Sequence, residues 1–287
     1  HYFFIYPILG LCVAVCCCSV FYITRLEMTM KNVFEHHGLG HLSASTINQW
    51  IQQPALCLLK IGGFSDGEAG AAAWRGSGVD RAVTKAAFNP DMKVDELINL
   101  AHKVFDDSHT KSINDHNSEK VAKERKAIAD YVKQGAQFYR GLGEQPESEQ
   151  GKVVVRIGDI QTPFVGYYDL LYKDKVRDTK TVGRQVSGLL QTASRQASIY
   201  SLGTGREPWI DYVTTKEVRA YRVERVDYWL RQVELATKSL ERVLSHSDDI
   251  IECCQLVYPD LDHWMWGDTM KRIAADIWQM ENHDELS

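Results

Sequence analysis

The sequence lacks the cysteine spacing that a disulfide framework or a closed zinc site would require. Of its seven cysteines, four lie within residues 12–18 and two, Cys253 and Cys254, are adjacent. No CxxC pair occurs, which argues against a structural zinc site and favours a reduced, intracellular chain. The remaining cysteine, Cys57, stands among leucines and is expected to be a small buried hydrophobe.

A strong net charge of either sign is also lacking, because the whole chain carries only −5. The distribution is less even than the total. Residues 152–231 hold fourteen Lys and Arg against nine Asp and Glu, so this segment is basic within an acidic protein. A basic segment is compatible with a phosphate-binding face and equally with solvated surfaces.

One long apolar run is present, at residues 2–23, and it is long enough to span a bilayer as a helix. No positive segment precedes it, so a cleaved signal peptide fits poorly. We interpret residues 1–27 as an extension that is not native to the functional protein, with a transmembrane helix as the alternative. Unless residues 2–23 are native, a membrane partner is not expected, and the predicted location is the cytoplasm of a bacterial or phage-infected cell.

In the remainder of the chain, the spacing of apolar residues changes once, from a helical pattern to one typical of strands. Helical spacing predominates in residues 28–150, and a polar loop rich in turn residues at 141–151 marks a boundary. Residues 151–287 begin with β-rich runs and continue with mixed strands and helices, and we expect them to form one structural unit with residues 43–150. The predicted fold class is α/β, with a central mixed β-sheet flanked by helices, a helical N-terminal part and a helical C-terminal tail. Strands are expected at 152–157, 164–172, 175–182, 209–215 and 217–224, and helices at 43–62 (bent at Pro54), 69–88, 94–105, 118–139, 187–202, 227–244 and 268–280.

Charged residues are expected to meet on one predicted hairpin. If a two-residue turn joins the strands at 164–172 and 175–182, Asp169 lies opposite Asp178, and Lys180 projects from the same face. Like charges at facing positions destabilise a sheet. The arrangement is explained either by a solvated Asp–Lys pair or by a divalent cation held between the carboxylates, which would activate water and neutralise phosphodiester charge.

The ordered motifs around these residues resemble the PD-(D/E)XK nuclease superfamily. GYYD at 166–169, DTKT at 178–181 and QASIY at 196–200 are similar to the pattern of its RecB-like nuclease domains and their phage and CRISPR-associated exonuclease relatives. The resemblance covers about residues 43–226, and it implies a restriction-endonuclease-like core and a Mg²⁺- or Mn²⁺-dependent deoxyribonuclease. Its partners would be DNA and recombination or replication proteins.

The resemblance also implies site roles. Asp169 and Asp178 would be catalytic metal ligands together with the backbone carbonyl of Thr179, and Lys180 would be the catalytic lysine. Gln196 and Tyr200, one helical turn apart, would contact DNA or orient the site. Candidate phosphate contacts are four basic residues: Arg177, Arg184, Arg195 and Arg206.

Two departures from the family pattern bear on these roles. A histidine commonly ligates the metal from a glycine-bearing helix in RecB-type members, and here Asp80 stands at that place as a candidate ligand. Some relatives hold a [4Fe–4S] cluster, but the cysteine spacing of this chain does not supply one, so no iron–sulfur cluster is expected. The leading hypothesis is a DNA nuclease of the exonuclease type, acting in recombination, repair or phage DNA processing. The alternative is a catalytically silent DNA- or partner-binding module on the same fold.

Overall fold

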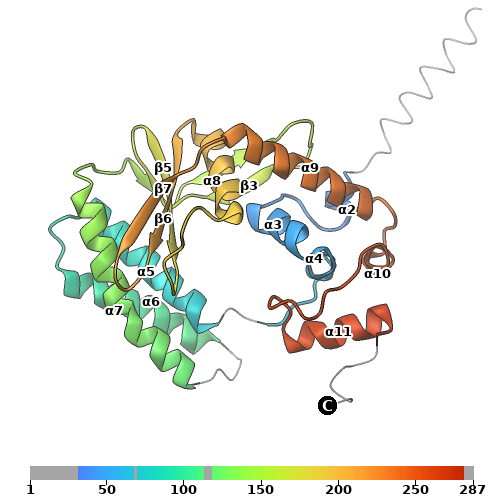
Figure 1. The fold of residues 1–287 in the computed structure, drawn as a ribbon, viewed down its shortest axis with the longest axis horizontal. Coiled ribbons are helices and arrows are strands. Elements are labelled where there is room, and N and C mark those ends of the chain that lie inside the picture. The colour runs from blue at the N-terminus through green and yellow to red at the C-terminus, as the bar shows by residue number, and fades with distance from the viewer. Residues whose placement is uncertain (1–31, 68–69, 113–117, 281–287) are drawn as a thin grey trace, which may run out of the picture.

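A computed structural model describes residues 32–67, 70–112 and 118–280 (Figure 1). The interpretation of residues 1–27 as an extension or a transmembrane helix therefore lies outside the described residues. Within the described ranges, no helix combines the length and the apolar character needed to cross a membrane.

A mixed sheet of five strands forms the centre of the fold, in the order β1-β4-β5-β6-β7. The central strands β5 and β6 are parallel, and the other neighbouring pairs are antiparallel. Helices cover both faces, so the predicted α/β class with a mixed sheet flanked by helices is confirmed. The strands are β1 (Ser148–Glu149), β4 (Leu170–Leu171), β5 (Lys175–Thr181), β6 (Glu207–Val213) and β7 (Val218–Arg222).

The prediction of one continuous strand at residues 164–172 is wrong. This segment forms β3 (Phe164–Tyr167), which pairs with β2 (Lys152–Val155) in a separate antiparallel ribbon, and then β4 of the main sheet. The chain bends at Asp169, whose side chain accepts a hydrogen bond from the backbone of β5. At this bend, which contains a candidate catalytic residue, the chain leaves the β2–β3 ribbon and enters the main sheet.

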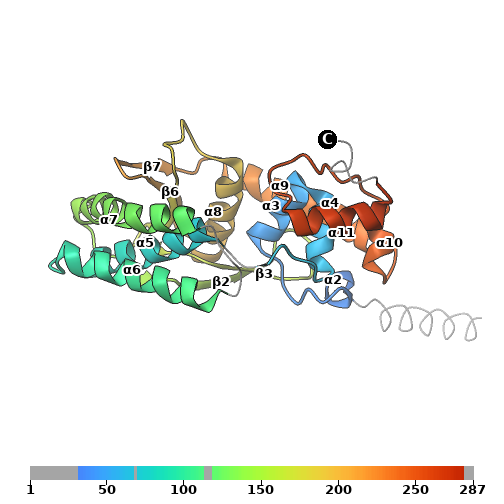
Figure 2. The ribbon, with the colours of Figure 1, turned by 90° about the horizontal axis from the view of Figure 1, so that it is seen from below.

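Three helices, α5 (Ala71–Phe88), α6 (Val94–Lys111) and α7 (Ser118–Gly141), pack together beside the sheet (Figures 1 and 2). Gly78 lets α5 approach α6 closely, since a Cβ there would lie 2.5 Å from the carbonyl oxygen of Ala101. Because glycine lowers helix propensity, Gly76 and Gly78 within one helical stretch predict close packing against another backbone at both positions. The structure shows such packing at Gly78 but not at Gly76, where a Cβ would make only an ordinary 3.4 Å contact with the side chain of Thr181.

A second group of helices shares its own apolar core. Its members are α2 (Val33–His36), α3 (Ala44–Gln52), α4 (Pro54–Ile61), α9 (Val226–Leu244), α10 (Ile250–Cys254) and α11 (Asp268–Trp278). Of the two serines that could cap the first helix, Ser43 and Ser45, Ser43 is the cap of α3. The bend predicted at Pro54 is the break between α3 and α4. Cys57 is buried as predicted.

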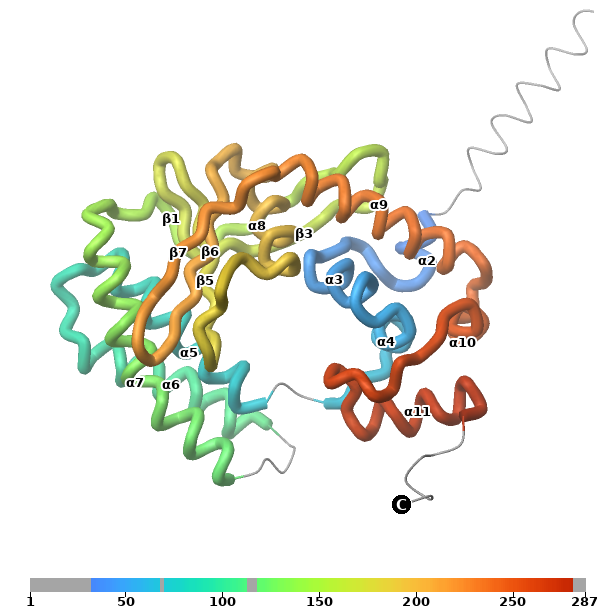
Figure 3. Tube along the Cα trace, in the orientation of Figure 1, coloured from blue at the N-terminus to red at the C-terminus, as the bar shows by residue number. Residues whose placement is uncertain are grey.

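The N-terminal helices of this group lie beside the C-terminal ones (Figure 3). The indole of Trp266 donates a buried hydrogen bond of 2.9 Å to the side chain of Gln53, between α3 and α4. Helix α8 (Gln191–Thr204) links the two parts of the molecule, because it packs on β5 and β6, on the β2–β3 ribbon, and on α3 and α9.

Candidate active site

Strand β5 distributes its side chains between two environments. Alternation along the strand places Asp178 and Lys180 on the face toward α8, in register with Ile210 and Tyr212 of β6, which pack with that helix. Asp178 is only 2% exposed, and its carboxylate lies 2.7 Å from the Lys180 ammonium, whose side chain is 35% exposed. The two residues therefore share one face of the strand, as the sequence predicts.

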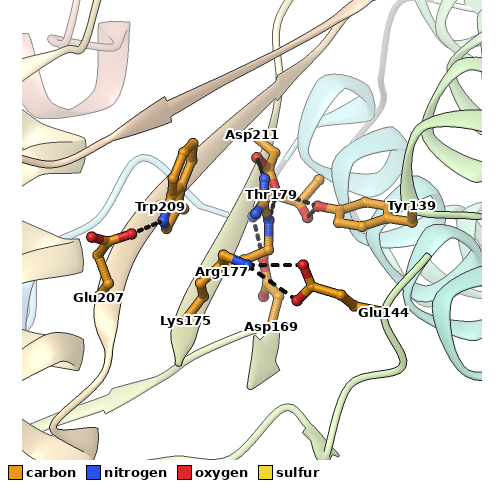
Figure 4. Close-up of polar contacts among 9 residues, drawn as sticks. All are labelled: Tyr139, Glu144, Asp169, Lys175, Arg177, Thr179, Glu207, Trp209 and Asp211. Atoms are coloured by element: carbon orange, nitrogen blue, oxygen red, sulfur yellow. Dashed lines mark hydrogen bonds and ion pairs between the residues drawn. The ribbon is translucent and has the colours of Figure 1, made fainter. Parts of the chain in front are cut away.

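Asp169 lies across the hairpin from Asp178. The predicted register is observed, because Leu170 pairs with Arg177 and Leu171 with Val176, which makes Asp169 and Asp178 the next facing positions. The Asp169 carboxylate accepts a hydrogen bond of 2.6 Å from the backbone N–H of Thr179 (Figure 4). This bond fixes the carboxylate beside the strand segment that carries the other candidate residues.

Asp80 approaches the same place from the middle of α5. One of its carboxylate oxygens accepts a hydrogen bond of 3.3 Å from the amide of Gln150. The other oxygen, Oδ1, is buried and has no hydrogen-bond partner among the described residues. A buried acceptor without a donor costs free energy, so this oxygen is available for a ligand.

A single open cavity brings the candidate residues together. Its volume is about 550 Å³, and its walls come from the first half of α5, the end of β3, strand β5 and helix α8. The predicted residues in its lining are Asp80, Asp169, Asp178, Thr179, Lys180 and Gln196.

The three carboxylates repel one another in this cavity. Burial, followed by repulsion from Asp178, raises the pKa of Asp80 to about 6. Burial and repulsion from Asp178 and Asp80 raise the pKa of Asp169 well above its usual range. Burial also raises the pKa of Asp178, against the opposing effect of Lys180, while contact with Asp178 raises the pKa of Lys180 despite its burial. Ionising all three carboxyl groups at once is therefore unfavourable in this cavity, even with the Lys180 ammonium nearby.

The chemistry of these residues fits a hard divalent cation. Carboxylate oxygens are the ligands that Mg²⁺ and Mn²⁺ prefer, and Asp80 offers a buried oxygen without a donor. The geometry is not preformed, because no set of three His, Cys, Asp or Glu side chains stands in metal-binding positions within residues 32–67, 70–112 and 118–280. Asp169 is held by the Thr179 N–H and Asp178 by Lys180, so binding a cation requires these carboxylates to rearrange.

The opposite face of β5 carries a buried polar network. Arg177 donates two hydrogen bonds, of 2.8 and 2.7 Å, to the carboxylate of Asp211 on β6. The hydroxyl of Tyr139 on α7 donates to Asp211 at 2.8 Å and contacts the Thr179 hydroxyl at 2.6 Å (Figure 4). Since the Thr179 N–H holds Asp169, the network supports the candidate site from behind. The interpretation of Arg177 as a phosphate contact is wrong, because its guanidinium is buried in this network.

Helix α8 contributes the predicted pair Gln196 and Tyr200. Gln196 lines the cavity and donates a hydrogen bond of 2.6 Å to the hydroxyl of Tyr200, which is 3% exposed. Tyr200 packs on the backbone of Gly166, where a Cβ would lie 2.5 Å from its ring. Tyr200 therefore orients Gln196 from a buried position, and a direct DNA contact by Tyr200 is not supported.

The other basic candidates are dispersed. Arg195 is 3% exposed and donates to the side chains of Asn48 and Gln232, so its interpretation as a DNA contact is wrong: the guanidinium ties α8 to α3 and α9. Arg206 is paired with Glu147 at 3.5 Å. Arg184 is exposed on the loop after β5 and keeps the accessibility expected of a phosphate contact.

Tyr167 and Arg75 are among the lining residues that were not predicted. Tyr167 extends from the end of β3 at the cavity and is 59% exposed. Arg75, near the start of α5, also lines the cavity and forms an ion pair with Glu124 on α7. Tyr167 could have been found from its motif, where it lies two residues before Asp169. Nothing local in the sequence marks Arg75.

Comparisons with known proteins leave the family open. No protein-family model and no curated protein matches the chain. A solved structure described as "Crystal structure of SSO0001" is weakly similar, with a TM-score of 0.30 and 12% sequence identity over 53% of this chain and 88% of that one. A similarity of this size carries no argument about function.

Proposed function

We propose that the protein is a metal-dependent DNA nuclease that hydrolyses phosphodiester bonds. The observation that carries the proposal is the meeting of Asp80, Asp169 and Asp178 with Lys180 in one open cavity. Carboxylates that are buried or half-buried and repel one another are costly in a structural role, and a cation would relieve that cost. The motif order that resembles PD-(D/E)XK nucleases supports the same assignment.

The residues divide the chemical work between them. Asp80, Asp169 and Asp178 would hold Mg²⁺ or Mn²⁺, with the backbone carbonyl of Thr179 as a further oxygen ligand. Such a bound ion lowers the pKa of water and neutralises phosphate charge. Lys180, released from Asp178, would donate to the negative charge that develops on the phosphate in the transition state.

The remaining candidates would act on the substrate. Gln196, fixed by Tyr200, is placed to donate to a phosphate or to orient water, and Arg184 is exposed for a backbone phosphate. A cytoplasmic exonuclease in recombination, repair or phage DNA processing, alongside recombination or replication proteins, is the corresponding biological proposal.

Cleavage assays test the function directly. End-labelled single- and double-stranded DNA is incubated with the purified protein and Mg²⁺ or Mn²⁺, and product lengths are followed over time. Asp178→Asn and Lys180→Met should each reduce the rate by at least about 100-fold, the size of effect expected when a group that stabilises the transition state is removed. Asp91→Asn, on the exposed turn between α5 and α6, is the matched control and should cut as the wild type does.

The same assay decides between catalysis and a silent binding module. The Asp178–Lys180 ion pair favours the alternative, because in this arrangement both groups satisfy each other without a cation. If the wild type and the variants all bind DNA without metal and none of them cleaves it, the protein is a catalytically silent binding module. Equal cleavage by the wild type and both variants would show that the catalytic assignment is wrong.

A further inference from the structure

The β2–β3 ribbon has one uncovered face that leads to the candidate active site. Register places Lys152 opposite Tyr167 and Val154 opposite Val165, and alternation directs these four side chains to the same side. We name these four residues the ribbon face.

The other side of the ribbon is closed by α8. A Cβ on Gly203 of α8 would lie 2.8 Å from the side chain of Val153, and the ring of Tyr200 packs on Gly166. Val153 is 5% exposed. The ribbon is thus anchored from within, and its outward face is held in a fixed position relative to the cavity.

The ribbon face combines apolar and cationic groups. Tyr167 is 59% exposed and Val154 57% exposed, while Lys152 is exposed beside them. Neither the Tyr167 nor the Lys152 side chain has a hydrogen bond or ion pair with any described residue. Arg156, just beyond β2, continues the alternation and is exposed, and the ribbon face contains no carboxylate.

Tyr167 belongs to both the ribbon face and the cavity. It is part of the cavity lining and lies two residues before Asp169. A molecule that covers Tyr167 is therefore adjacent to the candidate catalytic carboxylates. The ribbon face is continuous with the cavity rather than a separate patch.

We propose that the ribbon face binds a single strand of nucleic acid, with a nucleobase stacked on Tyr167 and a backbone phosphate contacting Lys152. The inference rests on the proposed function and specifies its substrate as an unpaired strand. In a duplex the faces of the bases are stacked on one another, whereas an unpaired base offers its face to an aromatic side chain. The lysine supplies the charge that such a strand requires.

Binding without metal tests the inference. Fluorescence anisotropy is measured in EDTA with a labelled oligothymidine of about 12 nucleotides, within the usual site size for single-strand binding, and with a duplex of the same length. Tyr167→Ala should weaken single-strand binding about 10-fold, and Tyr167→Trp should restore it. Lys152→Ala should reduce the salt dependence of binding by about 0.7 in the log–log slope. Tyr258→Ala, at a tyrosine that is 77% exposed between α10 and α11, is the matched control.

Three outcomes would overturn the inference: no single-strand binding by the wild type, unchanged binding by Tyr167→Ala, or equal weakening of duplex binding. A change of oligomeric state in Tyr167→Ala, measured by light scattering, would instead assign the ribbon face to contacts between copies of the chain. The inference and the proposed function fail separately. If Tyr167→Ala loses single-strand binding but the wild type never cleaves DNA, the ribbon-face inference is supported and the nuclease proposal is refuted. If the wild type cleaves DNA but Tyr167→Ala binds single strands as the wild type does, the nuclease proposal is supported and the ribbon-face inference is refuted.

Discussion

Replacing Arg177 by methionine should destabilise the protein strongly. The side chains of Arg177 and Asp211 are 4% and 0% exposed, and two hydrogen bonds join them. The substitution leaves the Asp211 carboxylate buried with only the Tyr139 hydroxyl as a donor. Removing one partner of such a pair costs about 3–5 kcal/mol, because the other charge remains buried without compensation. The guanidinium also lies 5.0 Å from the ring of Trp209, so packing is lost as well.

The measurement is urea denaturation followed by circular dichroism, supported by thermal unfolding. A loss of 3–5 kcal/mol corresponds to a fall in Tm of about 10 °C for a chain of this size. The double variant Arg177→Met/Asp211→Leu removes both charges, and it should recover most of the lost free energy of unfolding. Arg222→Met is the matched control, because Arg222 pairs with Glu207 on the surface, where such a pair is worth less than about 1 kcal/mol.

Two results would refute this reasoning. One is a loss below about 1 kcal/mol in Arg177→Met, which would show that the pair contributes no more than a surface ion pair. The other is a double variant as unstable as the single one, which would show that packing rather than uncompensated charge dominates.

Three further predictions follow from the same region. Without metal, Asp80→Asn should stabilise the protein: since the pKa of Asp80 rises from 3.8 to about 6 on folding, ionised Asp80 costs stability as pH rises through that window. The difference in free energy of unfolding between Asp80→Asn and the wild type should increase from pH 3.8 to about 6 and stay constant above it, at about 1–3 kcal/mol. It is measured by thermal unfolding in EDTA. Gly78→Ala should lower the free energy of unfolding by about 1–3 kcal/mol, because the new Cβ meets the carbonyl oxygen of Ala101 at 2.5 Å and neither helix backbone can yield easily. Tyr139→Phe removes the hydroxyl that supports Thr179 from behind and should weaken Mg²⁺ binding, measured by calorimetry, by about 10-fold or more.

Each of these has a contrasting control. Asp91→Asn, at an exposed position, should give a pH-independent stability difference near zero. Gly183→Ala adds a Cβ with no atom within 4 Å and should leave stability within about 0.5 kcal/mol of the wild type. Tyr258→Phe should not alter Mg²⁺ affinity. A gain for Asp80→Asn that is largest at low pH, or Mg²⁺ affinity unchanged by Tyr139→Phe, would contradict the electrostatic account of the site.

The register of the hairpin could be predicted from the sequence because side chains alternate along a strand. Alternation puts Asp178 and Lys180 on one face, and a two-residue turn between the strands determines which residues of the neighbouring segment lie opposite them. The transfer of the chain between two sheets at Asp169 could not be predicted, because β3 and β4 pair with different strands, β2 and β5, and local residue preference does not specify those partners.

The arginines show where local reasoning ends. Arg177 and Arg195 have the same side chain as exposed Arg184, and a count of basic residues treats them alike. Their burial depends on partners far away in sequence, Asp211 for Arg177 and Asn48 with Gln232 for Arg195. Only tertiary structure distinguishes a guanidinium that holds helices together from one that is free to meet a phosphate.

The hydrogen bond between Trp266 and Gln53 has a consequence for synthesis of the chain. The helices nearest the beginning of the described structure complete their apolar core with the C-terminal helices, and Trp266 is made 213 residues after its partner Gln53. During synthesis, the apolar surfaces of α3 and α4 therefore stay exposed until the C-terminal helices have been made, while the sheet and α5–α7 are already present. We expect nascent chains stalled before residue 266 to be bound by chaperones and cut by proteases within these two helices.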